Sequence, residues 1–248
     1  MNIEAGDDEK EIRLNRYLSD CGLGARRKVE ELIASGKVTL EGRPATEPGQ
    51  KVLPGQTVAL EGVVLVPLMK RYFLLNKPRG FVCAVSDKRE RTVFDLIGPQ
   101  YGKMGLFPVG RLDKDSEGLL LLTNDGDLAQ RLIHPSRGVL KKYEVRLDRP
   151  VSEPEMHSWS EGALVEGKWV KPVFVEKNPK RGPNWIRVTL REGRKRELRV
   201  MAEANGFKVI RLVRIAIGRL EIGDLSTGEI REMDRAELLR LTGIGGRP

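Results

Sequence analysis

The spacing of apolar residues divides the first part of the chain into helical and extended segments. Between residues 12 and 33, apolar side chains recur every three or four positions, and the run Gly22-Leu23-Gly24 interrupts them. This pattern predicts two short helices joined by a turn. Over residues 38–68, short runs of β-branched residues and leucine are separated by glycine and proline. The pattern therefore predicts a small α+β domain over residues 1–68.

The remainder of the chain is dominated by extended patterns. Apolar runs predict strands at Tyr72–Leu75, Phe81–Val85, Leu119–Leu122, Lys142–Leu147, Trp185–Leu190 and Val209–Ile217. Helical spacing follows the capping run at 123–126 and recurs around Leu198 and Met201. Because strands do not alternate regularly with helices, we expect an α+β fold with a mixed, largely antiparallel sheet and packed helices. The second domain is expected over residues 69–240, followed by a tail over 241–248.

Length and composition exclude several classes of protein. The 248 residues are 40% hydrophobic and 32% charged, which is typical of a globular chain of about two domains. Apolar runs are far shorter than the roughly 20 residues that a membrane helix needs, and the polar N-terminus predicts no secretory signal. Cys21 and Cys83 show neither disulfide nor zinc-site spacing. We therefore expect a cytoplasmic protein with no membrane contact and no metal.

The charge distribution points to a polyanionic partner. The chain carries 44 Lys and Arg against 35 Asp and Glu, a net charge of +9. Residues 1–68 hold 9 basic and 11 acidic side chains, so the remaining 180 residues hold 35 basic and 24 acidic and a net charge of +11. An excess of this kind suits a nucleic acid, although it is also compatible with an ordinary solvated surface.

Basic residues recur on the two predicted N-terminal helices. They are Arg13, Arg16, Arg26, Arg27 and Lys28. A charge run by itself is more typical of a solvated helix face. The sequence from "RLNRYLSDCGLG" to "VLPGQTVAL", however, resembles the S4 RNA-binding domain, in which two helices present basic side chains to folded RNA. The resemblance implies that these five residues bind RNA, while Ala25 stands where the family often has serine.

The segment from Gly110 to Gly118 holds three carboxylates and two cations and leads into four consecutive leucines. It closely resembles the signature G-R-L-D-x-x-[ST]-x-G-L-L-L-x-T of the small-subunit-type (RsuA-like) bacterial rRNA pseudouridine synthases. Further segments agree in order and spacing: "LLNKPRGFVCAV" with "TVFDLI", then "KKYEVRL", then "LREGRKRELRVMAEANGFKVIRLVRIAIG". Details such as "TVFD" are closest to the branch that acts on large-subunit (23S) RNA.

This resemblance implies isomerisation of one uridine of a structured rRNA stem-loop to pseudouridine, by a monomer and without a cofactor. Asp113 corresponds to the catalytic aspartate, which either adds to C1′ of the ribose or abstracts a ribose proton. Tyr143 packs against the target base, and Arg199 ion-pairs with Asp113. Arg111 enters the base stack as the uridine leaves it, and Leu212 lines the base pocket.

The family resemblance also implies that further basic residues of the second domain contact RNA phosphates. Such contacts contribute affinity but little sequence specificity. These residues are Arg194, Lys195, Arg196 and Arg214. The run "NKPRG" at 76–80 is expected to be architectural.

Three alternatives remain open at this point. Asp113 and Asp115 would suit Mg²⁺ in a nuclease, but Lys114 between them weakens that reading, and Asp115 is expected to be an ordinary loop residue. An RNA-binding ribosome assembly factor without activity is the second alternative, and a small-subunit (16S) enzyme is the third. Specificity of this kind lies in the shape of an RNA stem-loop, so the motifs leave the target uridine open.

Overall fold

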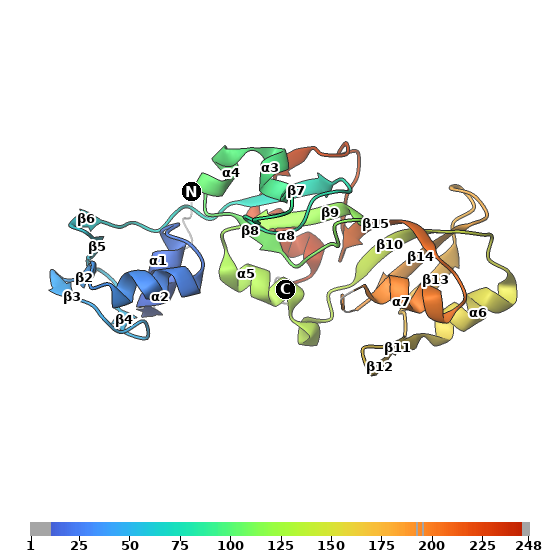
Figure 1. Cartoon of the computed structure of the whole chain (residues 1–248), viewed down its shortest axis with the longest axis horizontal. Helices are drawn as coiled ribbons and strands as arrows, with labels where there is room; N and C mark the ends of the chain where they lie inside the picture. Colours follow the sequence, from blue (N-terminus) through green and yellow to red (C-terminus); the bar gives the residue numbers. More distant parts are fainter. Residues whose placement is uncertain (1–10, 192, 195, 245–248) are drawn as a thin grey trace. The chain divides into compact units, whose positions relative to one another are not determined.

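The computed structural model describes residues 11–191, 193, 194 and 196–244. The chain divides into two compact units (Figure 1). The first comprises the residues up to 70 together with 100–106, and the second comprises 71–99 together with the residues from 107 onward. Each unit has a hydrophobic cluster of its own. Within the described residues, every helix is too short or too polar to span a bilayer.

The first unit packs two helices against small antiparallel sheets. The helices are α1 (Leu14–Asp20) and α2 (Arg26–Ala34), and the strands are β1 (Ile12–Arg13), β2 (Val38–Leu40), β3 (Arg43–Pro44), β4 (Lys51–Val52), β5 (Val58–Leu60) and β6 (Val63–Val64). Leu14, Leu18, Val29 and Ile33 are fully buried, because their spacing places them on one face of each helix. Gly22 takes φ +83°, a conformation that favours glycine, in the turn between the helices. The predicted pair of helices is confirmed.

A mixed sheet forms the centre of the second unit. In the described part of the chain its order is β13-β14-β10-β15-β9-β7-β17, with β16 beside β15 and β8 beside β9. The strands are β7 (Tyr72–Lys77), β8 (Phe107–Val109), β9 (Glu117–Thr123), β10 (Lys141–Leu147), β13 (Phe174–Lys177), β14 (Trp185–Leu190), β15 (Val209–Ile217), β16 (Leu220–Glu221) and β17 (Ile230–Glu232). The pair β9 and β15 is parallel, and the other pairings in the described sheet are antiparallel. The predicted α+β class and largely antiparallel sheet are confirmed.

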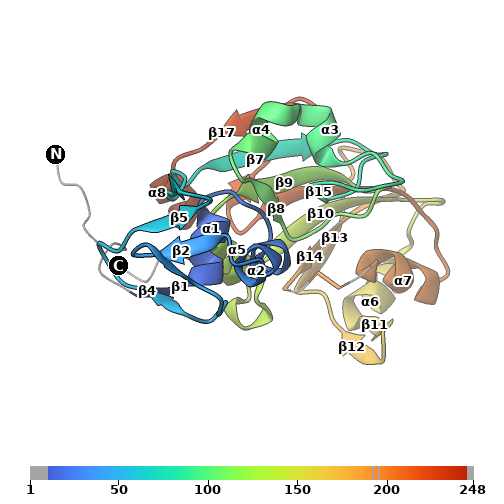
Figure 2. The ribbon, with the colours of Figure 1, turned by 60° about the vertical axis from the view of Figure 1, so that its left-hand side comes forward.

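Helices cover this sheet in two groups. Helices α5 (Gly126–Ile133) and α8 (Arg235–Thr242) pack against β7 and β9 in the hydrophobic cluster. Helices α6 (Glu153–Glu161) and α7 (Glu197–Ala204) lie near β13 and β14 with the hairpin of β11 (Ala163–Val165) and β12 (Lys168–Val170), as Figures 1 and 2 show. Between β7 and β8 the chain forms α3 (Val93–Ile97) and α4 (Pro99–Lys103), and a 3-10 turn at Pro135–Arg137 follows α5.

The strand predicted at Phe81–Val85 is wrong. This segment is a loop whose one sheet-like contact is an isolated bridge between Val82 and Thr92. Of its apolar side chains Phe81 alone is buried, and the Arg91 guanidinium lies 4.5 Å from the centre of its ring. The Cys83 sulfur lies 3.3 Å from both the backbone nitrogen and the carbonyl oxygen of Leu112. Phe81 and Cys83 are therefore held by contacts with side chain and backbone groups from other segments and not by strand pairing.

The predicted tail, residues 241–248, begins inside a helix. Helix α8 continues to Thr242, and both Thr242 and Ile244 are buried. Residues 245–248 lie outside the described residues.

Candidate active site

Asp113 lies on the loop between β8 and β9, which we call the Asp loop (residues 110–116). Strand β9 lies in the middle of the sheet between β7 and β15, and all seven of its residues are buried. The four leucines of the sequence motif form the centre of this strand. A loop that joins so rigid a strand has a fixed end, which suits a group that must be held in place.

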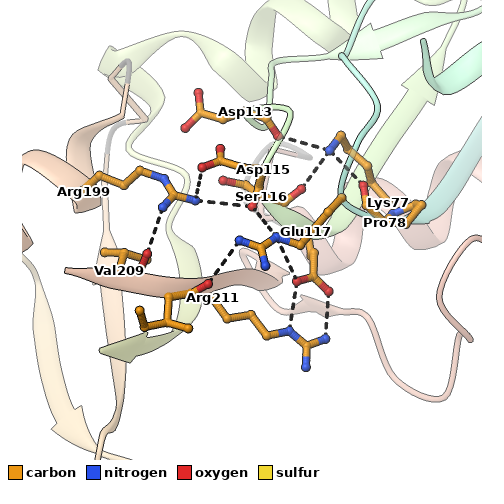
Figure 3. Close-up of polar contacts among 11 residues, drawn as sticks. Lys77, Pro78, Asp113, Asp115, Ser116, Glu117, Arg199, Val209 and Arg211 are labelled. Carbon is orange, nitrogen blue, oxygen red and sulfur yellow. Dashed lines mark hydrogen bonds and ion pairs between the residues drawn. The ribbon is translucent and has the colours of Figure 1, made fainter. Parts of the chain in front are cut away.

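A buried lysine holds the middle and the C-terminal end of the Asp loop. Lys77 ends β7 and is fully buried. Its ammonium donates hydrogen bonds to the carbonyl oxygens of Pro78 at 3.0 Å, Asp113 at 3.1 Å and Ser116 at 2.8 Å (Figure 3). Burial lowers the pKa of Lys77, while Cys83 and the carboxylates of the Asp loop region act in the opposite direction. Lys77 therefore fixes the backbone of the second half of the loop, from Asp113 to Ser116.

Two arginines connect the C-terminal end of the Asp loop to strand β15. Arg79 donates from Nε to the Asp115 carbonyl oxygen and from Nη2 to the Ile210 carbonyl oxygen, both at 3.1 Å. Arg211 binds the carboxylate of Glu117, the first residue of β9, through two hydrogen bonds of 2.9 and 2.8 Å (Figure 3). Paired hydrogen bonds between a guanidinium and a carboxylate are strong and directional. The start of β9 is thus anchored to β15.

Gly118 allows β15 to approach this strand closely. It pairs with Arg214 across the parallel β9 and β15 ladder and takes φ +104°. A Cβ atom at this position would lie 2.2 Å from the Arg214 carbonyl oxygen, so only glycine fits. The glycine in the sequence motif therefore serves to bring Arg214 next to the Asp loop.

A cavity of about 140 Å³ lies beside Asp113. A cavity of roughly 150 Å³ in another protein holds a six-membered aromatic ring, so the space is of the size that a single base needs. Predicted site residues from the Asp loop, β10, β15 and the segment before α7 line it: Arg111, Asp113, Tyr143, Arg194, Arg196, Leu212 and Arg214. The fold thus brings together residues as far apart in sequence as Arg111 and Arg214.

Tyr143 and Arg214 are neighbours on β10 and β15. Both are buried, with exposed fractions of 7% and 5%. Burial raises the pKa of the Tyr143 phenol, although the charge of Arg214 acts against this rise. Arg214 donates from Nε to the Leu119 carbonyl oxygen at 2.7 Å. Tyr143 is therefore protonated at neutral pH and offers the cavity an uncharged aromatic surface.

Arg199 pairs with Asp115 and not with Asp113, in contrast to the pairing that the family resemblance implies. Its Nη2 lies 2.8 Å from Asp115 Oδ2 and also donates to the Asp115 carbonyl oxygen at 3.3 Å (Figure 3). Its Nη1 donates to the Val209 carbonyl oxygen at 3.2 Å. Within the described residues, the carboxylate of Asp113 has no hydrogen bond or ion pair. The loop bends between these two residues. The Asp115 carboxylate therefore reaches Arg199 on α7, whereas Asp113 lines the cavity.

The remaining predicted residues are placed as follows. Arg196 lies in the left-handed region at φ +51°, just before α7, and its Nη1 is 3.8 Å from Asp115 Oδ1. Lys195 lies outside the described residues. In the first unit, Arg13, Arg26, Arg27 and Lys28 are exposed, and Arg16 lies 3.6 Å from Asp20.

Sequence reasoning missed the residues that hold the Asp loop: Lys77, Arg79, Asp115 and Arg211. A usable signal existed for Lys77, since a lysine two residues after the buried run Phe73-Leu74-Leu75 is unusual in a central strand. No comparable pattern marks Arg211 or Asp115. Among the described residues, no three or more His, Cys, Asp or Glu side chains gather as a metal site requires.

Comparisons with known proteins match both parts of the chain to protein families. A family model described as RNA pseudouridylate synthase matches residues 71–204, and the S4 domain model matches residues 12–58. An uncharacterized RNA pseudouridine synthase of Bacillus subtilis, YtzG, is 38% identical and covers 92% of this chain and 97% of its own length. The ribosomal large subunit pseudouridine synthase B of B. subtilis is 36% identical, with coverage of 94% and 96%.

A third relative and a solved structure support the same assignment. The dual-specificity RNA pseudouridine synthase RluF of Escherichia coli is 34% identical over 94% of this chain and 79% of its own length. A crystal structure of a pseudouridylate synthase superposes with a TM-score of 0.66 at 28% identity, covering 93% of this chain and 99% of that one. The loop, the cavity, the S4 match and these relatives lead to one conclusion: the chain belongs to the RNA pseudouridylate synthase family, whose members are isomerases acting on RNA, and carries an S4 domain ahead of its catalytic domain.

Proposed function

We propose that this protein isomerises one uridine of ribosomal RNA, in the large subunit (23S), and that Asp113 is its catalytic group. The observation that carries the proposal is the Asp113 carboxylate, which lines a base-sized cavity at the end of a rigid, clamped loop. A relative named for the large ribosomal subunit supports the choice of RNA, since it is 36% identical over nearly the full length of both chains.

Asp113 acts at C1′ of the ribose. The reaction breaks the bond between N1 of the uracil and C1′ and then joins C1′ to C5 of the same base. C5 gives up its hydrogen as a proton and N1 gains one, so the product is an isomer and no electron enters or leaves overall. The reaction therefore needs no cofactor. A carboxylate close to C1′ either adds to it covalently or abstracts a ribose proton, as glycoside chemistry allows. The absence of a resting partner for Asp113 among the described residues suits both routes, because the carboxylate is available to the substrate.

The other cavity residues bind and orient the flipped nucleotide. Tyr143 packs its ring against the uracil, and Leu212 on the neighbouring strand closes the apolar side of the pocket. Arg111 occupies the space that the uridine leaves in the stack. Arg194, Arg196 and Arg214 neutralise phosphates and charge near the pocket. Lys195, which lies outside the described residues, contacts a phosphate in the same proposal.

Mapping tests this function most directly. Pseudouridines are mapped in rRNA from cells with the gene and from cells without it. We expect one pseudouridine in 23S rRNA to disappear in the second sample and to return when the gene is restored. An unchanged map would contradict the enzyme assignment and favour an assembly factor, and a site lost from 16S rRNA would place the enzyme in the other branch.

We expect the S4 domain to recruit structured RNA without taking part in the chemistry. Arg26, Arg27 and Lys28 are exposed together at the start of α2, so replacing all three by glutamine removes up to three phosphate contacts. Each lost contact should lower the slope of log K against log salt by roughly 0.7 to 0.9, while the rate at saturating enzyme stays the same. Binding titrations at several salt concentrations measure the slope.

Two basic residues of the same unit provide the matched control. Lys37, which pairs with Glu61, and Arg43 on β3 are also exposed. The variant with Lys37→Gln and Arg43→Gln should keep the original slope. An equal loss of slope in both variants would indicate a general charge effect and not a defined RNA-binding face.

A further inference from the structure

One face of the sheet formed by β13, β14, β10 and β15 is accessible to solvent. Side chains alternate between the two faces along each strand, and the inner face carries Val145, Ile186 and Val188, which are fully buried. Helix α6 lies on this inner side, since Glu153 at its start pairs with Lys177, which stands opposite Ile186 in the ladder. The intervening residues of the strands point to the other side. We call it the outer sheet face, and it is formed by Lys142, Arg146, Phe174, Arg181, Arg187 and Arg211.

The outer sheet face is rich in cations. Arg211, Arg146 and Trp185 stand directly opposite one another on β15, β10 and β14. The Arg181 guanidinium lies 5.5 Å from the centre of the Trp185 ring. Lys142 and Arg146 are exposed, and in the part of the chain that the structure describes neither forms an ion pair. Against the five cations of this face stand three carboxylates, Glu117, Glu144 and Glu176.

Two of these carboxylates orient the arginines. Glu144 is 5% exposed, and its Oε2 lies 3.1 Å from Arg181 Nε, while its Oε1 lies 3.4 Å from both Nε and Nη2 of Arg187. Glu117 binds Arg211 through two hydrogen bonds. The three arginine side chains nevertheless remain 42–53% exposed. A guanidinium that is already oriented loses less conformational freedom when it binds an anion.

Phe174 adds an exposed aromatic ring to this face. It is 57% exposed and lies in one cross-strand row with Thr189 and Lys142. Unpaired RNA bases stack on aromatic rings and guanidinium planes, while cations beside them contact the phosphates. Duplex RNA presents its phosphates and 2′-hydroxyl groups but no free base face. The combination therefore suits a single strand better than a duplex.

The outer sheet face begins beside the Asp loop. Glu117, which binds Arg211, is the first residue after that loop (Figure 3). Arg79 joins the same two segments, because it donates to the carbonyl oxygens of Asp115 and Ile210. An RNA strand that leaves the active site over this end of β15 would meet Arg211 first and then Arg146 on the neighbouring strand.

We propose that the outer sheet face binds a single-stranded segment of the substrate RNA that flanks the target stem-loop. A base of this segment stacks on Phe174, and its phosphates contact Lys142, Arg146 and the three oriented arginines. The identity of the RNA rests on the proposed function. The preference for an unpaired strand rests on the chemistry of the face alone.

The first test uses a probe that does not depend on catalysis. It is an oligocytidylate of about twelve residues, which is unpaired at neutral pH and contains no uridine. Lys142→Gln with Arg146→Gln removes two exposed cations without breaking an ion pair of the described residues. Binding titrations of the full-length protein should show the slope of log K against log salt fall by about 1.4, or roughly 0.7 for each lost phosphate contact.

Phe174→Ala tests stacking separately from charge. It should weaken binding of the oligocytidylate by about fivefold or more and leave the salt slope unchanged, because a stacked base carries no charge.

The hairpin of β11 and β12 supplies matched controls in the same unit. Lys168 and Lys171 are exposed, and Trp169 between them is 66% exposed. The variant with Lys168→Gln and Lys171→Gln should keep the original slope, and Trp169→Ala should keep the original affinity.

The second test uses the rRNA fragment that contains the mapped uridine. Adding a single-stranded flank to the stem-loop should tighten its binding to the unmodified protein by about fivefold or more. The Lys142→Gln and Arg146→Gln variant should lose this gain. Its single-turnover rate on the stem-loop without a flank should be unchanged, since neither residue lines the cavity.

Three outcomes would overturn the inference. The first is an equal loss of slope in the test and control variants, which would indicate a general charge effect. The second is a slope that the Lys142→Gln and Arg146→Gln variant leaves unchanged. The third is tighter binding of duplex RNA than of the oligocytidylate, weakened by the same substitutions. The proposed function is judged by the rRNA map and by turnover, which the oligocytidylate titrations do not use, so the two proposals fail separately.

Discussion

Replacing Asp113 by asparagine is expected to abolish isomerisation while RNA binding persists. The amide keeps the shape of the side chain but can neither add to C1′ nor accept a ribose proton. Losses of about 10⁴-fold or more accompany removal of such a group in other enzymes. The loop itself should be unaffected, because Lys77 binds the backbone carbonyl of Asp113 and not its carboxylate. Single-turnover assays on the mapped rRNA fragment, alongside a binding titration, measure both quantities.

Asp224→Asn provides the control for the change in net charge. Asp224 lies exposed in the turn before Leu225, outside the residues that line the cavity. This variant should retain full activity. Substantial turnover by purified Asp113→Asn would refute the assignment of Asp113 as the catalytic group.

Replacing Lys77 by methionine is expected to lower both stability and the rate of the chemical step. Methionine fills the volume but leaves the buried carbonyl oxygen of Ser116 and the partly buried ones of Pro78 and Asp113 without their donor. Partial relief from burying a charge offsets this loss, so we expect the free energy of unfolding to fall by about 2–4 kcal/mol. A loop displaced by even an ångström can slow a reaction on the order of a hundredfold.

Unfolding in urea followed by tryptophan fluorescence measures the stability of the second unit, which contains Lys77. The three tryptophans, Trp159, Trp169 and Trp185, all lie in the second unit with Lys77. Lys168→Met, which replaces an exposed lysine of the same unit, should leave the urea midpoint and the rate unchanged. If Lys77→Met kept the original rate and midpoint, Lys77 would not be the residue that positions the Asp loop.

Local patterns were sufficient for several elements of this protein. The three-and-four spacing around Leu14 and Val29 predicted α1 and α2, because a helix buries one stripe of side chains whatever lies opposite. The four leucines at 119–122 predicted a buried strand for the same kind of reason. Helix α6 was overlooked although its start carries a readable capping box, formed by Ser152 and Glu155.

The sequence by itself also determined the candidate chemistry. The ordered motifs around Asp113, Tyr143 and Arg199 identified the family, which the comparisons confirmed. Gly118 belongs to the same motif, and its conformation explains why no other residue fits there. These features depend on short segments, in which each residue type is required by its own backbone or by the reaction.

Only the tertiary structure decided which charged groups meet. The apolar run at 81–85 has the composition of a strand, yet it forms a loop in which Phe81 contacts Arg91 and Cys83 contacts Leu112 of the Asp loop. Likewise, Arg199 lies 84 positions from Asp115 and has two carboxylates in its field. Sequence spacing does not show whether Asp113 or Asp115 is the partner of Arg199. The partner depends on the bend of the Asp loop, which the buried Lys77 holds through its backbone.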